Sequence, residues 1–278
     1  MKLLFDEFSS KASKMITNAY STSFSLGILY INRRIRDDIY AIYGFVRTAD
    51  EIVDSFDGYD KKSLLEKFKT ETRDAIENQI SVNPILNSFQ KTVHRYHIQY
   101  ELIDLFFKSM EMDLERLQYD RVTYEQYILG SAEVVGLMCL HVFTEKNKEV
   151  YEELKPFAMK LGSAFQKVNF MRDLKDDYQL LGRMYFPNLN ITDFSMQAKK
   201  QIEMDIEMDF KLALPGIKKL PRSSRTGVYL AYIYYLSLFN KIKRLPAHRL
   251  FVERVRINNG KKITLMFNSL IQLKLKWA

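Results

Sequence analysis

The 278-residue chain is 47% hydrophobic and 13% aromatic, which indicates a helix-rich globular protein with a large core, and we expect one domain over residues 1–278. The single cysteine, Cys139, excludes an internal disulfide and is expected in the core of a protein from a reducing compartment. The formal net charge of +8 is concentrated in residues 241–278, which carry +9, and this excludes a nucleic-acid-binding surface spread over the fold.

The N-terminus does not resemble a secretory signal, because acidic residues interrupt its apolar stretch after three residues. The longest apolar runs, 134–143 and 228–239, are too short to cross a bilayer. We therefore expect a cytoplasmic protein with no nucleic-acid partner.

Apolar residues at helical spacing predict an all-α fold, and no segment alternates as strands do. A short helix over 6–18 precedes serines at 21, 23 and 25, which would cap a helix or contact a phosphate. Further helices are expected at 33–56, 59–80, 84–98, 101–117, 123–143, 147–180, 196–213 and 222–245. Pro156 should kink or interrupt one of them. The expected architecture is a bundle of roughly ten helices around a central cavity.

Two further features of the sequence are an acid among apolar residues and an amphipathic C-terminal segment. Asp113 lies among apolar neighbours, so we expect it to face inward and to pair with an arginine across the bundle. The last stretch, 261–277, is apolar on one side with lysines at both ends. It fits a helix docked on the fold, which we prefer, or one lying on an anionic membrane surface.

A polar stripe marks the helix expected at 147–180. Gly162, Gln166, Asn169, Asp173 and Asp177 follow one another at steps of four, three, four and four, so they lie along one helix face. Apolar side chains flank the stripe on both sides. The pattern predicts a lined cavity with carboxylates at its mouth.

A second stripe lies in the helix expected at 33–56, where Tyr43, Arg47, Asp50 and Asp54 are spaced by four, three and four. Mg²⁺ is typically bound by one or two carboxylates together with substrate phosphates, and arginine can bind the remaining phosphate oxygens in bidentate fashion. Either stripe alone would be interpreted as a solvated acidic face. Two stripes with matching arginines favour a magnesium–diphosphate site.

Several other enzyme classes are excluded by their missing motifs. The chain has no phosphate-binding glycine loop, no nucleophile elbow, and no histidine preceded at three residues by glutamate as di-iron helices require. A helical cavity with acidic mouths remains, in which Mg²⁺ could help a diphosphate leave. The aromatic interior could shield the resulting carbocation from water.

In order and separation, these motifs resemble the squalene/phytoene synthase family over about residues 15–260. The resemblance rests on the following runs: Ser-Thr-Ser-Phe-Ser at 21–25, Tyr43-x-x-x-Arg47-x-x-Asp50-x-x-x-Asp54, Gln166-x-x-Asn169-x-x-Arg172-Asp173-x-x-x-Asp177, and Arg183-x-Tyr185-Phe186. It implies an all-α isoprenoid-synthase fold. It also implies a Mg²⁺-dependent (or Mn²⁺-dependent) head-to-head (1′–1) condensation of two prenyl diphosphates through a cyclopropyl intermediate.

The resemblance also implies a role for each matching residue. The metal–diphosphate cluster would be bound by Asp50, Asp54, Asp173 and Asp177. Diphosphate contacts would come from Arg47 and Arg172, with Ser21 and Ser23 near the same group. The reaction centre would be lined by Tyr43, Gln166, Asn169 and Tyr185, and the prenyl channel by Tyr127, Ser131 and Val135. An arginine of segment 253–257 would lie near the diphosphate.

The sequence departs from the family pattern at Leu129, where a second tyrosine is common, and at Glu133, where glycine is usual. These departures put substrate length and channel shape in question, but not the metal site. The residues within these motifs most resemble those of a bacterial phytoene synthase of carotenoid biosynthesis, which would use geranylgeranyl diphosphate without NADPH. The alternatives are a squalene or dehydrosqualene synthase using farnesyl diphosphate and, in another class, a non-catalytic assembly protein. The basic segment 241–278 would make peripheral membrane contact.

Overall fold

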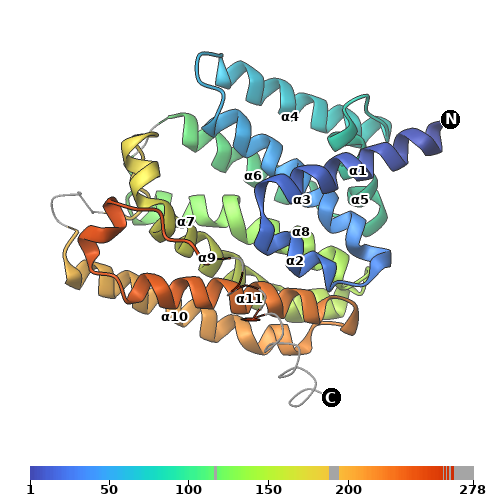
Figure 1. Cartoon of the computed structure of the whole chain (residues 1–278). Coiled ribbons are helices and arrows are strands. Elements are labelled where there is room, and N and C mark those ends of the chain that lie inside the picture. The colour runs from blue at the N-terminus through green and yellow to red at the C-terminus, as the bar shows by residue number, and fades with distance from the viewer. Residues whose placement is uncertain (116–117, 188–193, 259, 261, 263, 266–278) are drawn as a thin grey trace.

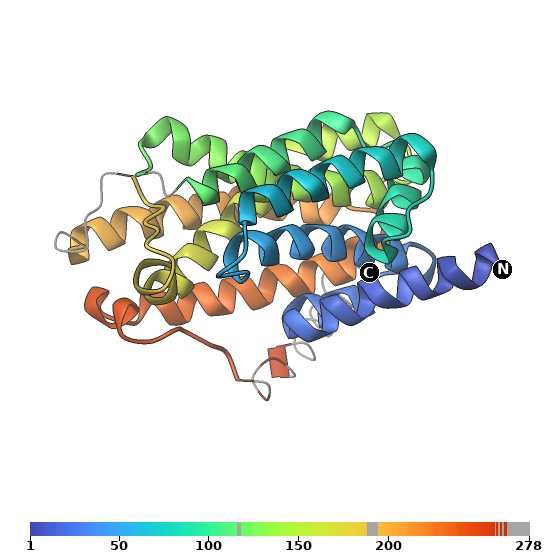
Figure 2. The same ribbon diagram turned by 90° about the horizontal axis from the view of Figure 1, so that it is seen from above.

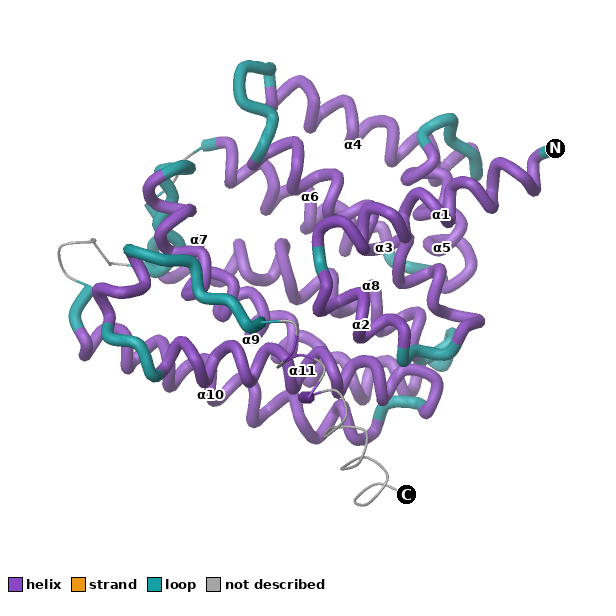
Figure 3. Tube along the Cα trace, viewed as in Figure 1, coloured by secondary structure: helices purple, strands orange, loops and turns teal. Residues whose placement is uncertain are grey.

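The computed structural model describes the whole chain except residues 116–117, 188–193, 259, 261, 263 and 266–278, and the described part contains helices and no strands (Figures 1 and 3). The first half of the chain forms α1 (Lys2–Tyr20), α2 (Thr22–Leu29), α3 (Arg33–Asp54), α4 (Lys61–Asn78), α5 (Pro84–Tyr96) and α6 (Tyr100–Leu114). The second half forms α7 (Arg121–Ile128), η1 (Leu129–Glu133), α8 (Val134–Phe143), α9 (Lys148–Gln179), α10 (Met196–Lys219), α11 (Arg222–Lys243) and η3 (Ala247–Phe251). The all-α prediction is confirmed.

Three segments can be compared with the sequence expectation. Of the two roles expected for the serines, helix capping is observed: the Ser21 hydroxyl accepts a hydrogen bond from the amide of Phe24 and caps α2, which includes the other two serines. Helix α9 continues through Pro156, so the proline does not interrupt it, although the Glu152 carbonyl loses its bond within the helix. The stretch expected as a terminal helix, 261–277, lies almost entirely outside the described residues.

The buried side chains form two aromatic-rich cores. One core is built mainly from α3, α4, α5, α6 and α8, and its centre is the parallel ring pair Phe45–Phe89, with centroids 3.9 Å apart. The other is built mainly from α7, α9, α10 and α11 around Phe210 and Phe239. Figure 2 shows α3 between α4 of the same core and α11 of the other. The cavity described below lies where the two halves meet.

The run Arg121–Phe143 is one continuous helix, because α7 and α8 are joined by the π-helical turn η1. By length and composition alone it could cross a membrane, with a mean hydropathy of 1.4 over its most apolar window, so the expectation that every apolar run is too short is corrected. Half of that window is buried in the protein, and the helix packs against α6 and α9. Core helices of soluble proteins pass the same test.

Small residues let this helix approach its neighbours closely. A Cβ added at Gly130 would lie 2.5 Å from the carbonyl oxygen of Leu105 in α6, and one at Gly162 would lie 2.6 Å from the carbonyl oxygen of Ala132 in η1. Neither glycine can therefore be replaced without moving backbone. The close crossing fixes how α9 presents its polar stripe to the cavity.

Candidate active site

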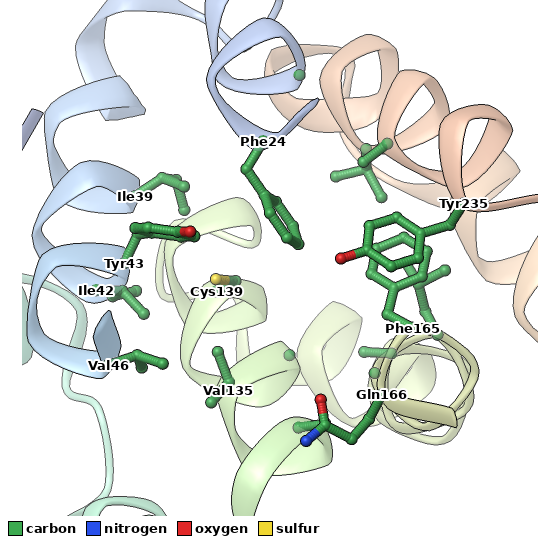
Figure 4. Close-up of a pocket in the computed structure, with 18 of the residues that line it drawn as sticks. Phe24, Ile39, Ile42, Tyr43, Val46, Val135, Cys139, Phe165, Gln166 and Tyr235 are labelled. Atoms are coloured by element: carbon green, nitrogen blue, oxygen red, sulfur yellow. The ribbon is translucent and has the colours of Figure 1, made fainter. Parts of the chain in front are cut away.

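A cavity of about 530 Å³ lies between α2, α3, α8, α9 and α11 (Figure 4). Its interior is mainly apolar and extends to Phe143, Phe157 and Leu220. Its charged and polar rim includes Tyr20, Arg47, Asp50, Arg172 and Arg254. Cys139 lies in the wall, and burial in these surroundings raises the pKa of its thiol to about 12. The arrangement suits an amphiphile with a long apolar chain and an anionic head.

Of the two aspartates in the α3 stripe, Asp50 lines the cavity and Asp54 forms an ion pair. Burial, followed by repulsion from Asp54, raises the pKa of Asp50 to about 7. Arg47 reaches Asp50 only at 3.8 Å, because it also pairs with Glu51. The Nε of Arg47 is buried without a hydrogen-bond partner, so a donor is left for an anion. Asp54 is held by Arg183, whose Nη1 lies 2.6 Å from its Oδ1.

The α9 stripe has the same division. Asp173 is paired with Arg172 of its own helix and with Arg254 from the segment after η3, whose Nε lies 2.6 Å from its Oδ1. Asp177 forms no ion pair with any described residue. Burial, followed by repulsion from Asp173 and Asp54, raises its pKa to about 8. Arg183 donates its backbone amide to the Asp177 carbonyl at 2.8 Å and its guanidinium to Asp54, so the acidic ends of the two stripes lie close together.

These carboxylates fit a magnesium ion only when a substrate shares it. In the described part of the chain, no three His, Cys, Asp or Glu side chains gather closely enough to hold an ion by themselves. Mg²⁺ prefers oxygen ligands and is usually bound through one or two carboxylates plus phosphate oxygens, which is what each stripe offers. The pKa values of Asp50 and Asp177 are raised because burial and repulsion between the aspartates outweigh the attraction of Arg47 and Arg183.

A chain of polar groups crosses the cavity below this mouth. Gln166 donates to the hydroxyl of Ser131 at 3.2 Å and accepts from Asn169 at 3.4 Å. The Tyr235 hydroxyl donates to the Asn169 side-chain oxygen at 3.2 Å. The amides of the α9 stripe are thus oriented by α11 on one side and by η1 on the other.

Aromatic rings surround the space next to this chain. Phe165 and Tyr235 stack with centroids 3.9 Å apart, and Phe24 lies between Tyr43 and Tyr235, at 5.6 and 5.8 Å (Figure 4). Burial raises the pKa of Tyr43 to about 12, so its phenol stays neutral near pH 7. Electron-rich ring faces attract a cation and carry no nucleophile strong enough to trap it.

A buried network behind the cavity joins the exit of α9 to α6. Asp113 accepts hydrogen bonds from the hydroxyls of Tyr127 at 2.7 Å and Tyr185 at 2.8 Å. Arg183 lies 3.6 Å from Asp113 and also binds Asp54. The inward orientation of Asp113 and its arginine partner agree with the sequence expectation. Through Arg183, the network positions Asp54 at the mouth.

The cavity wall brings together most of the residues that the sequence singled out: Ser21, Tyr43, Arg47, Asp50, Tyr127, Ser131, Val135, Gln166, Asn169 and Arg172. Asp173 lies beside its mouth through its pairs with Arg172 and Arg254, and Asp54 and Asp177 lie one helical turn beyond Asp50 and Asp173. Two other singled-out residues lie outside this wall. Ser23 does not line the cavity, because α2 is helical and residues two apart point in different directions. Tyr185 lies behind Tyr127, with its hydroxyl on Asp113.

The sequence reasoning did not assign five residues that the structure places in or next to the site: Phe24, Phe165, Arg183, Tyr235 and Arg254. Arg183 stood in a quoted motif, and Arg254 lies in the segment 253–257, so a signal existed for both. Leu129 and Glu133 do not line the cavity. Leu129 packs against the core that contains α3 and α8, and Glu133 lies near Lys160 and Lys167 of α9.

The fold and the site together define a helical protein whose mainly apolar cavity opens between two acidic stripes. The sequence profile of the family "Squalene/phytoene synthase" matches residues 17–261. The chain belongs to this family.

The relatives carry different names. Presqualene diphosphate synthase of Zymomonas mobilis is 28% identical, over 78% of this chain and 71% of its own length. The 4,4'-diapophytoene synthase of Staphylococcus haemolyticus is 28% identical, over 68% and 66%. The chloroplastic phytoene synthase 1 of Zea mays is 23% identical, over 89% and 64%, so this chain spans somewhat less than two thirds of that protein.

Solved structures agree in fold. A dehydrosqualene synthase superposes with a TM-score of 0.83 at 21% identity, covering 97% of this chain and 98% of that one. A squalene synthase of Alicyclobacillus acidocaldarius superposes with a TM-score of 0.74 at 20% identity, covering 86% and 94%. The isoprenoid-synthase fold implied by the sequence motifs is confirmed.

Proposed function

We propose that this protein is a prenyltransferase that condenses two geranylgeranyl diphosphates head to head (1′–1), giving phytoene through a cyclopropyl (prephytoene) diphosphate in carotenoid biosynthesis. The observation that carries the proposal is the pair of facing acidic stripes, each with an arginine, at the mouth of an apolar cavity. Mg²⁺, when bound with the diphosphates, would stabilise the negative charge of the leaving group.

The residues of the chain supply the rest of the mechanism. Arg47, with its unpaired buried Nε, and Arg172 would bind diphosphate oxygens as the carbon–oxygen bond breaks. The stacked rings of Phe165 and Tyr235 would stabilise the positive charge left on the prenyl chain. The apolar interior would exclude water, which would otherwise capture the cation as an alcohol.

Two observations support the longer, C20 substrate. The cavity continues past the rings of Phe24 and Phe165 to Phe157 and Leu220, which leaves apolar space beyond the reaction centre. Plant phytoene synthases are among the relatives that match the largest share of this chain, up to 89%. The loss of a proton ends this reaction, so NADPH is not required.

A second candidate is the condensation of two farnesyl diphosphates to a C30 product, as a squalene or dehydrosqualene synthase. It is favoured by the superposition on a dehydrosqualene synthase over nearly the whole of both chains, and by the diapophytoene synthase relative. The two candidates share the mouth and differ in the depth of cavity that the chains fill.

Product analysis distinguishes these candidates. Purified protein with Mg²⁺ is offered farnesyl or geranylgeranyl diphosphate, each with and without NADPH, and the extracted hydrocarbons are identified. A C40 product without NADPH supports phytoene synthase, and a C30 product transfers the assignment to the second candidate. If folded protein turns over neither substrate, the proposed activity is wrong and a non-catalytic assembly protein becomes the better interpretation.

We also propose a cytoplasmic location, with peripheral membrane contact through the basic segment 241–278. Its net charge of +9 would be attracted to anionic headgroups. Deletion of residues 261–278 should lower liposome association, and undiminished association would remove this segment from the contact.

A further inference from the structure

The N-terminal helix α1 is packed through its polar face. Ser9, Ser13 and Thr17 are fully buried where α1 meets α3 and α5. A Cβ added at Gly44 of α3 would lie 3.1 Å from Ser13, so small residues on both helices allow the close approach. The large apolar side chains of α1 therefore contribute little to the core.

Those apolar side chains form a stripe on the outer face. Leu4, Phe8 and Met15 are 71%, 55% and 71% exposed, and with Lys11 they follow one another at steps of four, three and four. Leu3, 78% exposed, lies beside them. Exposed apolar patches rimmed by polar residues mark surfaces that contact a partner or a membrane. We call Leu4, Phe8 and Met15 the α1 stripe.

The charges around the α1 stripe are mainly positive. Lys11 and Lys14 are exposed, whereas Asp6 is largely covered and bonded to Lys2 of the same helix and to Asn87 and Lys91 of α5. Glu7 is then the single exposed acid of this helix. Exposed apolar side chains with lysines around them are complementary to an anionic lipid surface, and lysine stems can lie along the apolar layer while their ammonium groups reach the headgroups.

A comparable stripe on α10 lacks this complementarity. Met204, Met208 and Leu212 are 55%, 54% and 45% exposed at four-residue steps. Around it, the exposed Lys200 and Lys211 are balanced by the partly exposed Asp205 and Glu207, so this face carries less net positive charge than that of α1. Exposed apolar area alone therefore does not single out α1; the net positive charge around its stripe does.

The α1 stripe also leads to the mouth of the cavity. The last residue of the helix, Tyr20, is half exposed, lines the cavity and lies under the guanidinium of Arg47, 4.3 Å from the ring centroid. Residues 252–258 run from η3 toward α2 (Figure 1), and Lys262 of the basic segment 241–278 is bonded to Thr22 at the start of α2. Two basic elements thus adjoin at the same rim.

We propose that α1 docks on an anionic lipid bilayer, with the α1 stripe in the headgroup region and Lys11 and Lys14 on lipid phosphates. The cavity mouth then opens beside the membrane, from which prenyl chains enter and into which the hydrocarbon product leaves. That benefit rests on the proposed function, but the docking itself is a property of α1 alone.

Vesicle co-sedimentation of the full chain, without substrate or Mg²⁺, tests the docking. Vesicles of phosphatidylcholine are compared with vesicles that also contain phosphatidylglycerol. We expect binding to the anionic vesicles, weakened about tenfold or more in the triple variant Leu4→Gln, Phe8→Gln, Met15→Gln. The pair Lys11→Gln, Lys14→Gln should lose several-fold on anionic vesicles only. The matched control Met204→Gln, Met208→Gln, Leu212→Gln should bind as the parent does.

Equal binding of the parent and the triple variant, both folded by circular dichroism, would overturn the proposal. So would a parent dimer that the triple variant converts to a monomer in light scattering, because a second copy would then cover the stripe. If the triple variant is poorly folded, the lysine pair decides by the same comparison. Turnover in detergent should survive in the triple variant, and vesicle binding by a protein with no turnover would support docking while removing the proposed activity.

Discussion

The two acidic stripes at the mouth come from helices far apart in the sequence, yet each divides its aspartates in the same way. On α3, Asp54 is bonded to Arg183, while Asp50 is reached by Arg47 only at 3.8 Å. On α9, Asp173 is paired with two arginines, while Asp177 has no ion pair in the described part of the chain. The aspartates without a close partner are the ones with strongly raised pKa values.

Within each stripe, this difference distinguishes the aspartate that stabilises the protein structure from the aspartate that is available to a ligand. An aspartate paired with arginine is neutralised by the protein itself. A buried aspartate without such a partner keeps its cost of ionisation until a cation arrives, so it is the better candidate for holding a metal. Asp50 and Asp177 should therefore matter more for metal binding, and Asp54 and Asp173 more for the shape of the mouth.

The largest expected effect follows substitution of Asp50 or Asp177, the two aspartates without a close ion-pair partner. With Asp50→Asn or Asp177→Asn, turnover of the prenyl diphosphate should fall about a hundredfold or more, because the metal loses a charged ligand. The melting temperature of the metal-free protein should stay the same or rise. Steady-state kinetics at several Mg²⁺ concentrations, with circular dichroism as the folding control, measure this. Unchanged turnover would mean that the stripes do not bind the metal.

Breaking the network behind the stripes should mainly reduce stability. Asp113→Asn leaves the guanidinium of Arg183 in a buried site with less compensating charge, and the free energy of unfolding should drop by about 3 kcal/mol. Asp104→Asn on the same helix removes a solvent-exposed partner of Arg73 and should cost less than about 1 kcal/mol. Urea unfolding of both variants provides the comparison. Equal losses of unfolding free energy in the two variants would show that Asp113 does not stabilise the buried network more than a surface acid does.

The raised pKa values of Asp50 and Asp177 also predict that stability depends on pH. The pKa values of Asp50 and Asp177 are raised from 3.8 in the folded protein to about 7 and 8, so the folded state binds more protons than the unfolded state between these limits. Their contribution to stability is present below pH 3.8 and is lost as the pH rises through 7 to 8. In chelator, the melting temperature should fall from pH 6 to pH 9, and Mg²⁺ should reverse part of the fall.

The double variant Asp50→Asn, Asp177→Asn is the control for this titration. It lacks both groups, so its melting temperature should change less over the same pH range. If the slope persists in the double variant, other groups cause it.

A smaller effect is expected at Arg254. Its ion pair with Asp173 is 40% exposed on the arginine side, so Arg254→Gln should change stability by less than about 1 kcal/mol. Because Arg254 also lines the cavity mouth, the KM for prenyl diphosphate should rise by about tenfold. The matched control is Arg249→Gln, whose partner Glu253 lies outside the cavity. A KM equal to that of the control would place Arg254 outside the substrate site.

Much of this site could be predicted from local sequence spacing. Both stripes follow from steps of three and four within single helices, and so does the inward position of Asp113. Motifs contained Arg183 and Arg254, but their pairing with the stripes could not be predicted from spacing, because both reach the stripes from elsewhere in the chain through tertiary packing. The helix that turns Ser23 away from Ser21 was not predicted either, because the short α2 depends on a cap and on packing against α11, not on a long apolar period.

The smallest effect is expected where the sequence departs from its family. Glu133 belongs to η1, and its side chain lies near Lys160 and Lys167, outside the cavity wall. Glu133→Gly should therefore leave the chain length of the product unchanged, although a glycine within a helix should lower stability by about 1 kcal/mol. Phe157→Ala, by contrast, enlarges the deep end of the cavity and should shift products toward longer chains. Competition between farnesyl and geranylgeranyl diphosphate measures both. A changed product ratio in Glu133→Gly would mean that η1 shapes the channel from behind its wall.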